Sequence, residues 1–333
     1  MEKNARIFVA GHSGMVGSAI VRHLQKKGFS QLILRNRKEL DLLDQTAVKQ
    51  FYMDEKPEYV FDAAAKVGGI HANNTFRAQF IYENLQIQNN LIHFAHESDV
   101  IKLLFLGSSC IYPRGCPQPM KEEYLLSGPL ETTNEPYAMA KIAGIKLCEN
   151  YFRQYGCHFF SVMPTNAYGP NDNYDLETSH ALPALIRKIH DAKMNGAKEV
   201  TIWGSGNPTR EFVHVDDIAR ACLFIMDLDF QRLYHQGLTH FNVGTGKEIT
   251  IRALAEMIAS IACFSGSLIF DESMPDGTPR KVLNVSRING EGWQYSVSLE
   301  EGIKATYDWY IRHDELPSSR GELAVESEAV IQR

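Results

Sequence analysis

The first half of the chain alternates short apolar runs with longer stretches in which apolar residues recur every three to four positions. The runs are typical of buried β-strands and read RIFVAG, LILR, YVFDAAA and KLLFLGSS. The stretches between them have a helical period and cover 15–27, 44–55, a long segment through Asn84, and 137–155. Strands that alternate with helices build βαβ units. The pattern therefore predicts an α/β fold, a doubly wound parallel sheet of the Rossmann type with helices on both faces.

The pattern changes after FFSVMPTNAYGPND, where loops break up the helices. This change predicts a smaller α/β substrate domain that is interwoven with the first. We expect an NADP-binding domain from 1–170 plus 210–245, and a substrate-binding domain from 171–209 plus 246–315. Residues 316–333 show no convincing apolar period, and we expect a mobile tail there.

Composition narrows the class of protein. The 333 residues carry a formal net charge of −6, which argues against a dedicated nucleic-acid binder but is compatible with an anionic small-molecule substrate. No apolar run reaches the roughly 18 residues of a membrane span, and the first residues lack signal-peptide anatomy. The six cysteines show neither a CxxC pair nor metal-ligand spacing. We expect a cytoplasmic protein without a metal, a membrane partner or a nucleic-acid partner.

Three glycines lie between the first strand and the first helix, in the spacing GxxGxxG. Glycines at such a turn let the backbone approach a pyrophosphate, which the positive N-terminus of the helix attracts. A plain strand-to-helix turn is the alternative. The motif predicts a dinucleotide-binding loop formed by Gly11, Ser13, Gly14, Met15, Val16 and Gly17.

The end of the second strand bears on which nicotinamide cofactor binds. An acidic residue there would favour NAD, but the strand ends in Arg35 and Arg37, with no carboxylate before Glu39. Guanidinium groups can clamp a 2′-phosphate, so NADP(H) is favoured. The alternative is that one or both arginines are simply solvated.

Tyr137 and Lys141 are four residues apart and so share one face of a predicted helix, with Asn134 as a plausible N-cap and Pro136 in the first turn. The lysine would lower the pKa of the phenol and could hold a ribose hydroxyl. A serine from another strand could bind the same substrate oxygen, polarising a carbonyl during hydride transfer. The alternative is a Tyr–Lys pair on a solvated face.

Taken together, the motifs resemble the extended short-chain dehydrogenase/reductase family, and within it the bifunctional GDP-4-keto-6-deoxy-D-mannose 3,5-epimerase/4-reductases. The resemblance reaches to about Arg312, and one departure is Ser13, where some members have arginine. It implies NADP(H), a GDP-sugar substrate, GDP-L-fucose as product, and a homodimer joined by helices of the cofactor domain. It rests on GHSGMVGSAI, AAKVGGIHAN, FLGSSCIYP, TNEPYAMAKIAGIKLCE, SVMPTNAYGPNDN, WGSGNPTREFVHVDD and PDGTPRK.

The resemblance also assigns roles. Ser108 would join Tyr137 and Lys141 in the reduction, while Cys110 would be the base and His180 the acid of the epimerisation. The substrate carbonyl acidifies its neighbours C3 and C5, and groups with reference pKa values near ~8.5 and ~6.5 suit proton exchange there. On a strand, Cys110 would share a face with Ser108. The alternatives are an inert buried thiol and a helix-capping histidine.

Further contacts are implied by the same resemblance. Arginine would bind the diphosphate, Trp203 offers an apolar wall, and Lys188 stands where an arginine is usual; each charge could otherwise be a solvated surface residue. Further cations are Arg187, Arg280 and Lys281. The implied cofactor contacts are Leu106, Gly107, Lys141, Pro164, Thr165, Asn166 and His180. The implied substrate contacts are Lys188, Trp203, Arg210 and Asp276.

Two other functions stay open at this point. One is a sister enzyme, either of the GDP-colitose synthase type or a nucleotide-sugar epimerase that retains its cofactor. The other is a catalytically silent, dinucleotide-binding regulatory protein, against which the complete set of Ser108, Tyr137 and Lys141 argues. Consumption of NADPH with candidate sugars would discriminate among them.

Overall fold

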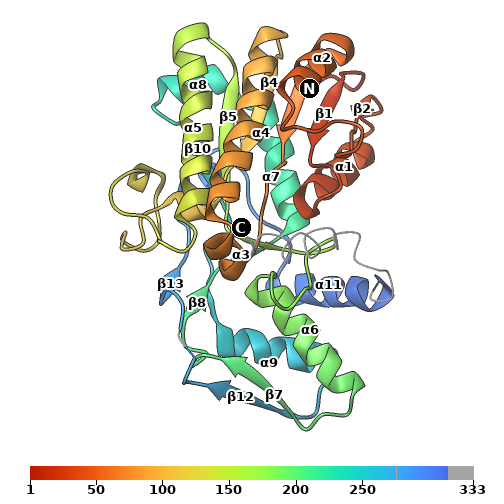
Figure 1. The fold of residues 1–333 in the computed structure, drawn as a ribbon, viewed down its shortest axis with the longest axis vertical. Coiled ribbons are helices and arrows are strands. Elements are labelled where there is room, and N and C mark those ends of the chain that lie inside the picture. The colour runs from red at the N-terminus through yellow and green to blue at the C-terminus, as the bar shows by residue number, and fades with distance from the viewer. Residues whose placement is uncertain (275, 314–333) are drawn as a thin grey trace, which may run out of the picture.

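The computed structural model describes residues 1–274 and 276–313, shown as a coloured ribbon in Figure 1. The predicted tail, 316–333, lies outside the described residues. Within the described part of the chain, no helix combines the length and apolar character that a membrane span requires.

A six-stranded parallel sheet forms the larger part of the molecule. Its order is β2-β1-β3-β4-β5-β10, so the chain reverses direction across the sheet between β1 and β3. The carboxyl ends beside such a reversal are where ligands bind in open α/β sheets. The predicted α/β fold is thereby confirmed. The strands are β1 (Ile7–Ala10), β2 (Leu32–Ile33), β3 (Tyr59–Asp62), β4 (Lys102–Leu106), β5 (Phe159–Pro164) and β10 (His240–Val243).

Helices cover both faces of this sheet (Figure 1). On one face α1 (Met15–Lys26) packs against α7 (Val215–Asp227). On the other face α4 contacts both α2 and α5. Two short helices, α3 (Ile70–Thr75) and α8 (Phe230–His235), and the 3₁₀ turns Ser109–Ile111 and Glu122–Tyr124 complete this part. The bounds of the second group are α2 (Gln45–Glu55), α4 (Arg77–Glu97) and α5 (Glu135–Tyr155).

The predicted helix through Asn84 needs a correction, because α4 continues to Glu97. Buried polar residues interrupt its apolar period. The Asn84 amide donates to the Lys66 carbonyl oxygen, and the Gln88 amide donates to that of Ala140 in α5. Such bonds let polar side chains occupy core positions, which an apolar pattern cannot anticipate.

The second lobe is smaller and lies at the bottom of Figure 1, where α6 and α9 cover the pair β7–β12. Its core is a separate hydrophobic cluster built from α6, α9, α11 and neighbouring strands. Leu283 and Trp293 pack instead into the core of the large sheet. The domain boundaries given above stay a prediction. The remaining elements of the chain are β6 (Asn166–Tyr168), α6 (Ala181–Met194), β7 (Glu199–Trp203), β8 (Thr209–Arg210), β9 (Phe212–His214), β11 (Ile249–Thr250), α9 (Ile251–Ala262), β12 (Ser267–Asp271), β13 (Arg280–Lys281), α10 (Ser286–Gly290) and α11 (Leu299–His313).

One buried carboxylate ties distant segments together. Glu211, which is fully buried, accepts hydrogen bonds from the backbone N–H groups of Thr245, Gly246 and Leu283, each at 2.7 Å. A buried backbone N–H group that loses a charged acceptor lowers the free energy of unfolding. This single side chain, which follows β8, therefore holds the segment after β10 and the segment after β13 together.

We expect Glu211→Ala to lower the free energy of unfolding by roughly 3 kcal/mol or more, because three backbone donors lose their acceptor. Urea denaturation measures the change. Glu248→Ala is the matched control, since Glu248 forms a more exposed ion pair with Arg280 at 2.8 Å and should cost about 1 kcal/mol or less. Equal losses in the two variants would contradict the assigned role of Glu211.

Candidate active site

The glycine loop between β1 and α1 is packed closely against neighbouring backbone. Gly11 has a φ of +74°, and a Cβ atom there would lie 2.7 Å from the Ala63 carbonyl oxygen. A Cβ atom on Gly17 would overlap the Gly11 carbonyl group. Gly14 is the N-cap residue of α1 and has no side chain that could bond to the free N–H groups of the positive helix end. This cradle fits a pyrophosphate. Ser13 is exposed on the loop, and Met15 and Val16 open the helix.

The two arginines after β2 differ in their surroundings. Arg35 forms an ion pair with Glu55 and also donates to the Leu34 carbonyl oxygen at 3.0 Å. Arg37 is exposed and has no side-chain hydrogen bond or ion pair among the described residues. The Asn36 side chain orders the turn by accepting the backbone N–H of Lys38 at 2.9 Å. Of the two guanidinium groups, that of Arg37 is free for a phosphate.

The Tyr–Lys pair stands on α5, whose first turn contains Pro136. Lys141 is 3% exposed, and its Nζ donates to the Leu106 carbonyl oxygen at 2.8 Å, which links α5 to the end of β4. The same Nζ lies 5.8 Å from the centre of the Tyr137 ring. Asn134 occupies the N-cap position, but its side chain makes no capping bond. The helix therefore brings phenol and ammonium to the carboxyl edge of the sheet.

Burial dominates the titration of this pair. It raises the pKa of Tyr137, and a negative charge on Cys110 would raise that pKa further. Burial lowers the pKa of Lys141, while the charges of Asp62 and Cys110 act in the opposite direction. The expected lowering of the phenol pKa is thus not found, because burial disfavours the charged phenolate.

Ser108 and Cys110 lie just beyond β4. The Ser108 side chain caps a 3₁₀ turn by accepting the Cys110 backbone N–H at 3.4 Å. The expected shared strand face is wrong, because the strand ends at Leu106 and Cys110 lies on that turn. Gly107, between the end of the strand and Ser108, packs so tightly on the Met163 side chain that a Cβ atom would overlap it.

Cys110 is 8% exposed, and burial raises the pKa of its thiol. Lys281, Ser108 and Lys141 each act against that rise. His180 is the N-cap residue of α6, makes no side-chain capping bond and is exposed to solvent. Desolvation and the charge of Lys281 lower the pKa of His180. Cys110 and His180 are therefore both within electrostatic reach of one ammonium group.

The second lobe supplies the remaining predicted substrate residues in two sets. In the first, β8 pairs in parallel with β13, so Arg210 stands in register with Lys281. Asp276 is bound to Ser205, accepting its backbone N–H at 2.9 Å and its hydroxyl at 2.6 Å. In the second set, the Lys188 Nζ lies 5.4 Å from the centre of the Trp203 ring.

The segment after β5 meets Glu211. Thr165 donates from its backbone N–H to Val243 at 2.9 Å, and the Asn166 amide donates to the Glu211 carbonyl oxygen at 2.7 Å. Pro164 is the last residue of β5. These three predicted cofactor contacts lie at the same carboxyl edge as Leu106, beside β10.

Two residues were not assigned from the sequence. Lys281 was noted only as one cation of several, and its position became clear through the β8–β13 pairing. Asp62 ends β3, is fully buried, and interacts electrostatically with Lys141. A carboxylate inside the apolar run YVFDAAA was the available signal.

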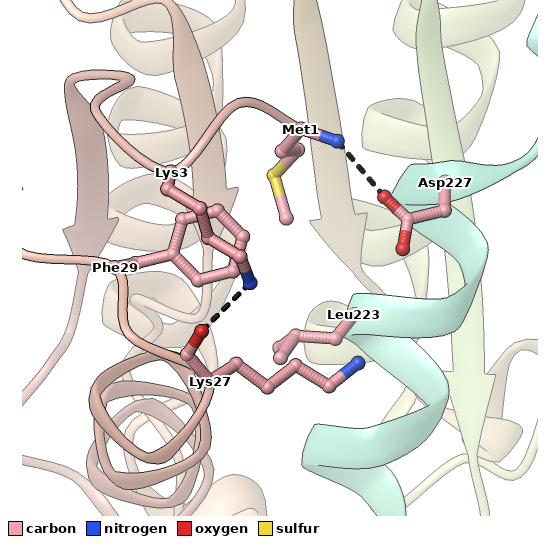
Figure 2. Close-up of a pocket in the computed structure, with 6 residues that line it drawn as sticks. All are labelled: Met1, Lys3, Lys27, Phe29, Leu223 and Asp227. Carbon is pink, nitrogen blue, oxygen red and sulfur yellow. Dashed lines mark hydrogen bonds and ion pairs between the residues drawn. The ribbon is translucent and has the colours of Figure 1, made fainter.

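A small cavity of about 80 Å³ lies elsewhere, between the N-terminal segment, the end of α1 and α7 (Figure 2). Its polar groups are largely paired with one another. The Met1 ammonium group binds Asp227 at 3.0 Å, and the Lys3 Nζ donates to the Lys27 carbonyl oxygen at 2.7 Å. None of the predicted site residues lines this cavity, so it has no part in the candidate chemistry.

Known proteins are similar to this chain in both sequence and fold. Residues 7–244 match the model of the NAD dependent epimerase/dehydratase family. The chain is 56% identical to GDP-L-fucose synthase 1 of Arabidopsis thaliana, over 94% of this chain and 95% of that protein. It is 54% identical to GDP-L-fucose synthase of Escherichia coli strain K12, over 93% and 98%.

A solved structure agrees with these relatives. The structure of a GDP-L-fucose synthetase from Naegleria fowleri bound to NADP superposes with a TM-score of 0.87 at 30% identity, covering 95% of each chain. The fold, the glycine cradle and the relatives point in one direction: the chain belongs to the NAD dependent epimerase/dehydratase family and, within it, to the GDP-L-fucose synthases.

Proposed function

We propose that the protein converts GDP-4-keto-6-deoxy-D-mannose to GDP-L-fucose, by inverting C3 and C5 and then reducing C4 with NADPH. The observation that carries the proposal is that the Lys141 Nζ, beside Tyr137, donates to Leu106 at the end of β4 at 2.8 Å, while the turn directly after that strand carries Ser108 and Cys110. Cys110, which would exchange protons, and the Tyr137–Lys141 pair, which would act in the reduction, thus lie near the same end of β4. A ketone bound there could serve both reactions.

In the reduction, a bound nicotinamide dinucleotide would supply the hydride. Tyr137 donates its proton to O4 as the hydride arrives at C4, and the Ser108 hydroxyl binds the same oxygen. The raised pKa of Tyr137 keeps the phenol protonated at neutral pH, which suits a proton donor. Lys141 stabilises the phenolate that remains and holds a ribose hydroxyl.

In the epimerisation, the groups that bind O4 also stabilise the enolate formed when C3 or C5 loses a proton. Cys110 removes that proton as a thiolate, and His180 returns one to the opposite face of the sugar. Lys281 favours the thiolate and opposes protonation of His180. Binding of an anionic substrate beside Lys281 would weaken both effects.

The diphosphate of the substrate would lie on the cations of the paired strands β8 and β13, Arg210 and Lys281. The exposed Trp203 ring and Lys188 form the neighbouring surface. Asp276 contributes by fixing the loop at Ser205. We also propose a homodimer through α4 and α5, on which Tyr82 is 65% exposed and Met139 is 44% exposed.

The cofactor is a nicotinamide dinucleotide, and we propose NADP(H) on the basis of the free guanidinium group of Arg37. Arg37→Ala should raise the KM for NADPH by roughly 10- to 100-fold, the equivalent of one or two charge-assisted hydrogen bonds, and leave the KM for NADH unchanged. Arg35→Ala is the control and should alter the NADPH preference less, because Arg35 pairs with Glu55. Equal losses for both cofactors would place Arg37 away from the 2′-phosphate.

One reaction in D₂O tests the proposed function. The enzyme, NADPH and GDP-4-keto-6-deoxy-D-mannose are combined, and the product is read by NMR and mass spectrometry. NADPH oxidation with deuterium at both C3 and C5 is the expected result. Reduction without deuterium would leave a simple ketoreductase. If no reaction occurs, the substrate is instead that of a sister enzyme, such as a GDP-colitose synthase or an epimerase that retains its cofactor.

A further inference from the structure

A buried carboxylate beneath the proposed active site has only part of its hydrogen-bonding capacity filled. Asp62 is 0% exposed, and its Oδ1 accepts the Ala64 backbone N–H at 3.2 Å. Its Oδ2 has no hydrogen-bond partner among the described residues. Burying such an oxygen is costly unless a nearby charge compensates.

The compensating charge is that of Lys141. Asp62 stands in register with Phe105 of β4, and the Lys141 Nζ binds the carbonyl oxygen of the next residue, Leu106, at 2.8 Å. That Nζ also lies 4.6 Å from the centre of the Phe105 ring. The ammonium group is thus held at the end of the strand that is paired with Asp62.

The other groups around Asp62 cannot supply a positive charge. Tyr52 faces it from α2 and Cys148 faces it from α5, and the negative charge of Asp62 raises the pKa of each. Its register partners in the sheet, Ala10 and Phe105, are apolar. Toward Lys141, the other titratable group that acts across the site is Cys110.

The effect is mutual. Burial raises the pKa of Asp62 to about 6, with Lys141 acting against the rise, so the carboxylate is ionised at neutral pH. Burial lowers the pKa of Lys141, and Asp62 opposes that fall more strongly than Cys110 does. Each charge therefore stabilises the ionised form of the other group at a buried position that water does not solvate.

We infer that Asp62 is a positioning residue of the reductase: its buried carboxylate holds Lys141 in the ammonium form beside Tyr137. This inference rests on the proposed function, because the ammonium group matters there for the phenolate that proton donation leaves. Asp62 touches neither sugar nor cofactor in this scheme. It acts through Lys141 alone.

Asp62→Asn tests the inference, because the amide oxygen can still accept the Ala64 N–H while the charge is lost. The pKa of Lys141 is read from its carbon-13 Cε resonance, assigned with Lys141→Met. We expect that pKa to fall by on the order of one unit. The alkaline limb of kcat for NADPH oxidation should shift to lower pH by a similar amount, with little change in the KM for the sugar.

Asp217→Asn is the matched control. Asp217 is also 0% exposed, but it binds Ser296 and Arg220 and does not act on Lys141. The Asp217→Asn variant should be less stable, but the pKa of Lys141 and the alkaline limb of kcat should not change. Asp62→Leu provides a second variant without the charge.

An unchanged Lys141 titration in both Asp62 variants would overturn the inference, as would an equal shift in Asp217→Asn. The resonance is measured without substrate, so it answers independently of turnover. If the wild-type protein fails to oxidise NADPH with the sugar, the proposed function fails, and the NMR titration still decides the role of Asp62.

Discussion

Tyr137→Phe is expected to lower kcat for the NADPH-dependent reduction by roughly 10²- to 10⁴-fold, the usual contribution of a positioned proton donor. The phenylalanine ring fills the same space, so the fold and the binding of the sugar should be preserved. Exchange of the C3 and C5 protons with solvent should fall much less than the reduction, because Cys110 and His180 remain and Ser108 still binds O4. NADPH absorbance measures the first effect, and deuterium uptake measures the second.

Tyr151→Phe is the control on the same helix. The Tyr151 hydroxyl lies 2.7 Å from His93 Nδ1, on a part of α5 that does not reach the proposed site. Its removal should leave kcat within about twofold of the wild type, the effect of less than one neutral hydrogen bond. A Tyr137→Phe variant that reduces the sugar at the wild-type rate would remove Tyr137 from the mechanism.

The second large effect concerns Cys110. Cys110→Ala should reduce deuterium incorporation at C3 and C5 by roughly 10²-fold or more, because the base is lost. Cys116→Ala, whose thiol is also near Lys281, should retain it. Full incorporation in Cys110→Ala would show that another group removes the proton.

The pH dependence of this exchange follows from the two shifted groups. Burial raises the pKa of Cys110, so the thiolate becomes more abundant as pH increases. The pKa of His180 is lowered, so its protonated form is already lost at a lower pH. The reactive combination of thiolate and imidazolium is therefore a minor species, and exchange should follow a bell-shaped profile between the two pKa values. A profile that rises with pH and never falls would exclude imidazolium as the acid.

The sequence was sufficient for elements whose pattern is uninterrupted. The helix expected at 15–27 is Met15–Lys26, and Asp44 caps the helix expected at 44–55. The pattern failed for α4, where Asn84 and Gln88 are buried because the backbone of neighbouring elements accepts their hydrogen bonds. Such partners are set by the tertiary fold and leave no trace in hydropathy.

The candidate site divides in a similar way. Gly11 and Gly17 could be singled out because the turn between β1 and α1 is local. The coupling of Cys110 with Lys281 could not be, since these residues are far apart in the chain and meet only through the strand pairing around β8. The role of Asp62 cannot be predicted from the sequence for a related reason: it depends on Lys141, which a distant helix supplies.

The carboxylate of Glu211 has an evolutionary consequence. All three of its acceptor bonds are made with backbone N–H groups, which every residue except proline provides. A substitution at Thr245 can therefore preserve the tie, whereas Leu283 is also a buried core residue and Gly244 lies too close to the carboxylate to accept a side chain. Sequence change at this joint is therefore restricted at Glu211, Gly244 and Leu283, and less so at Thr245.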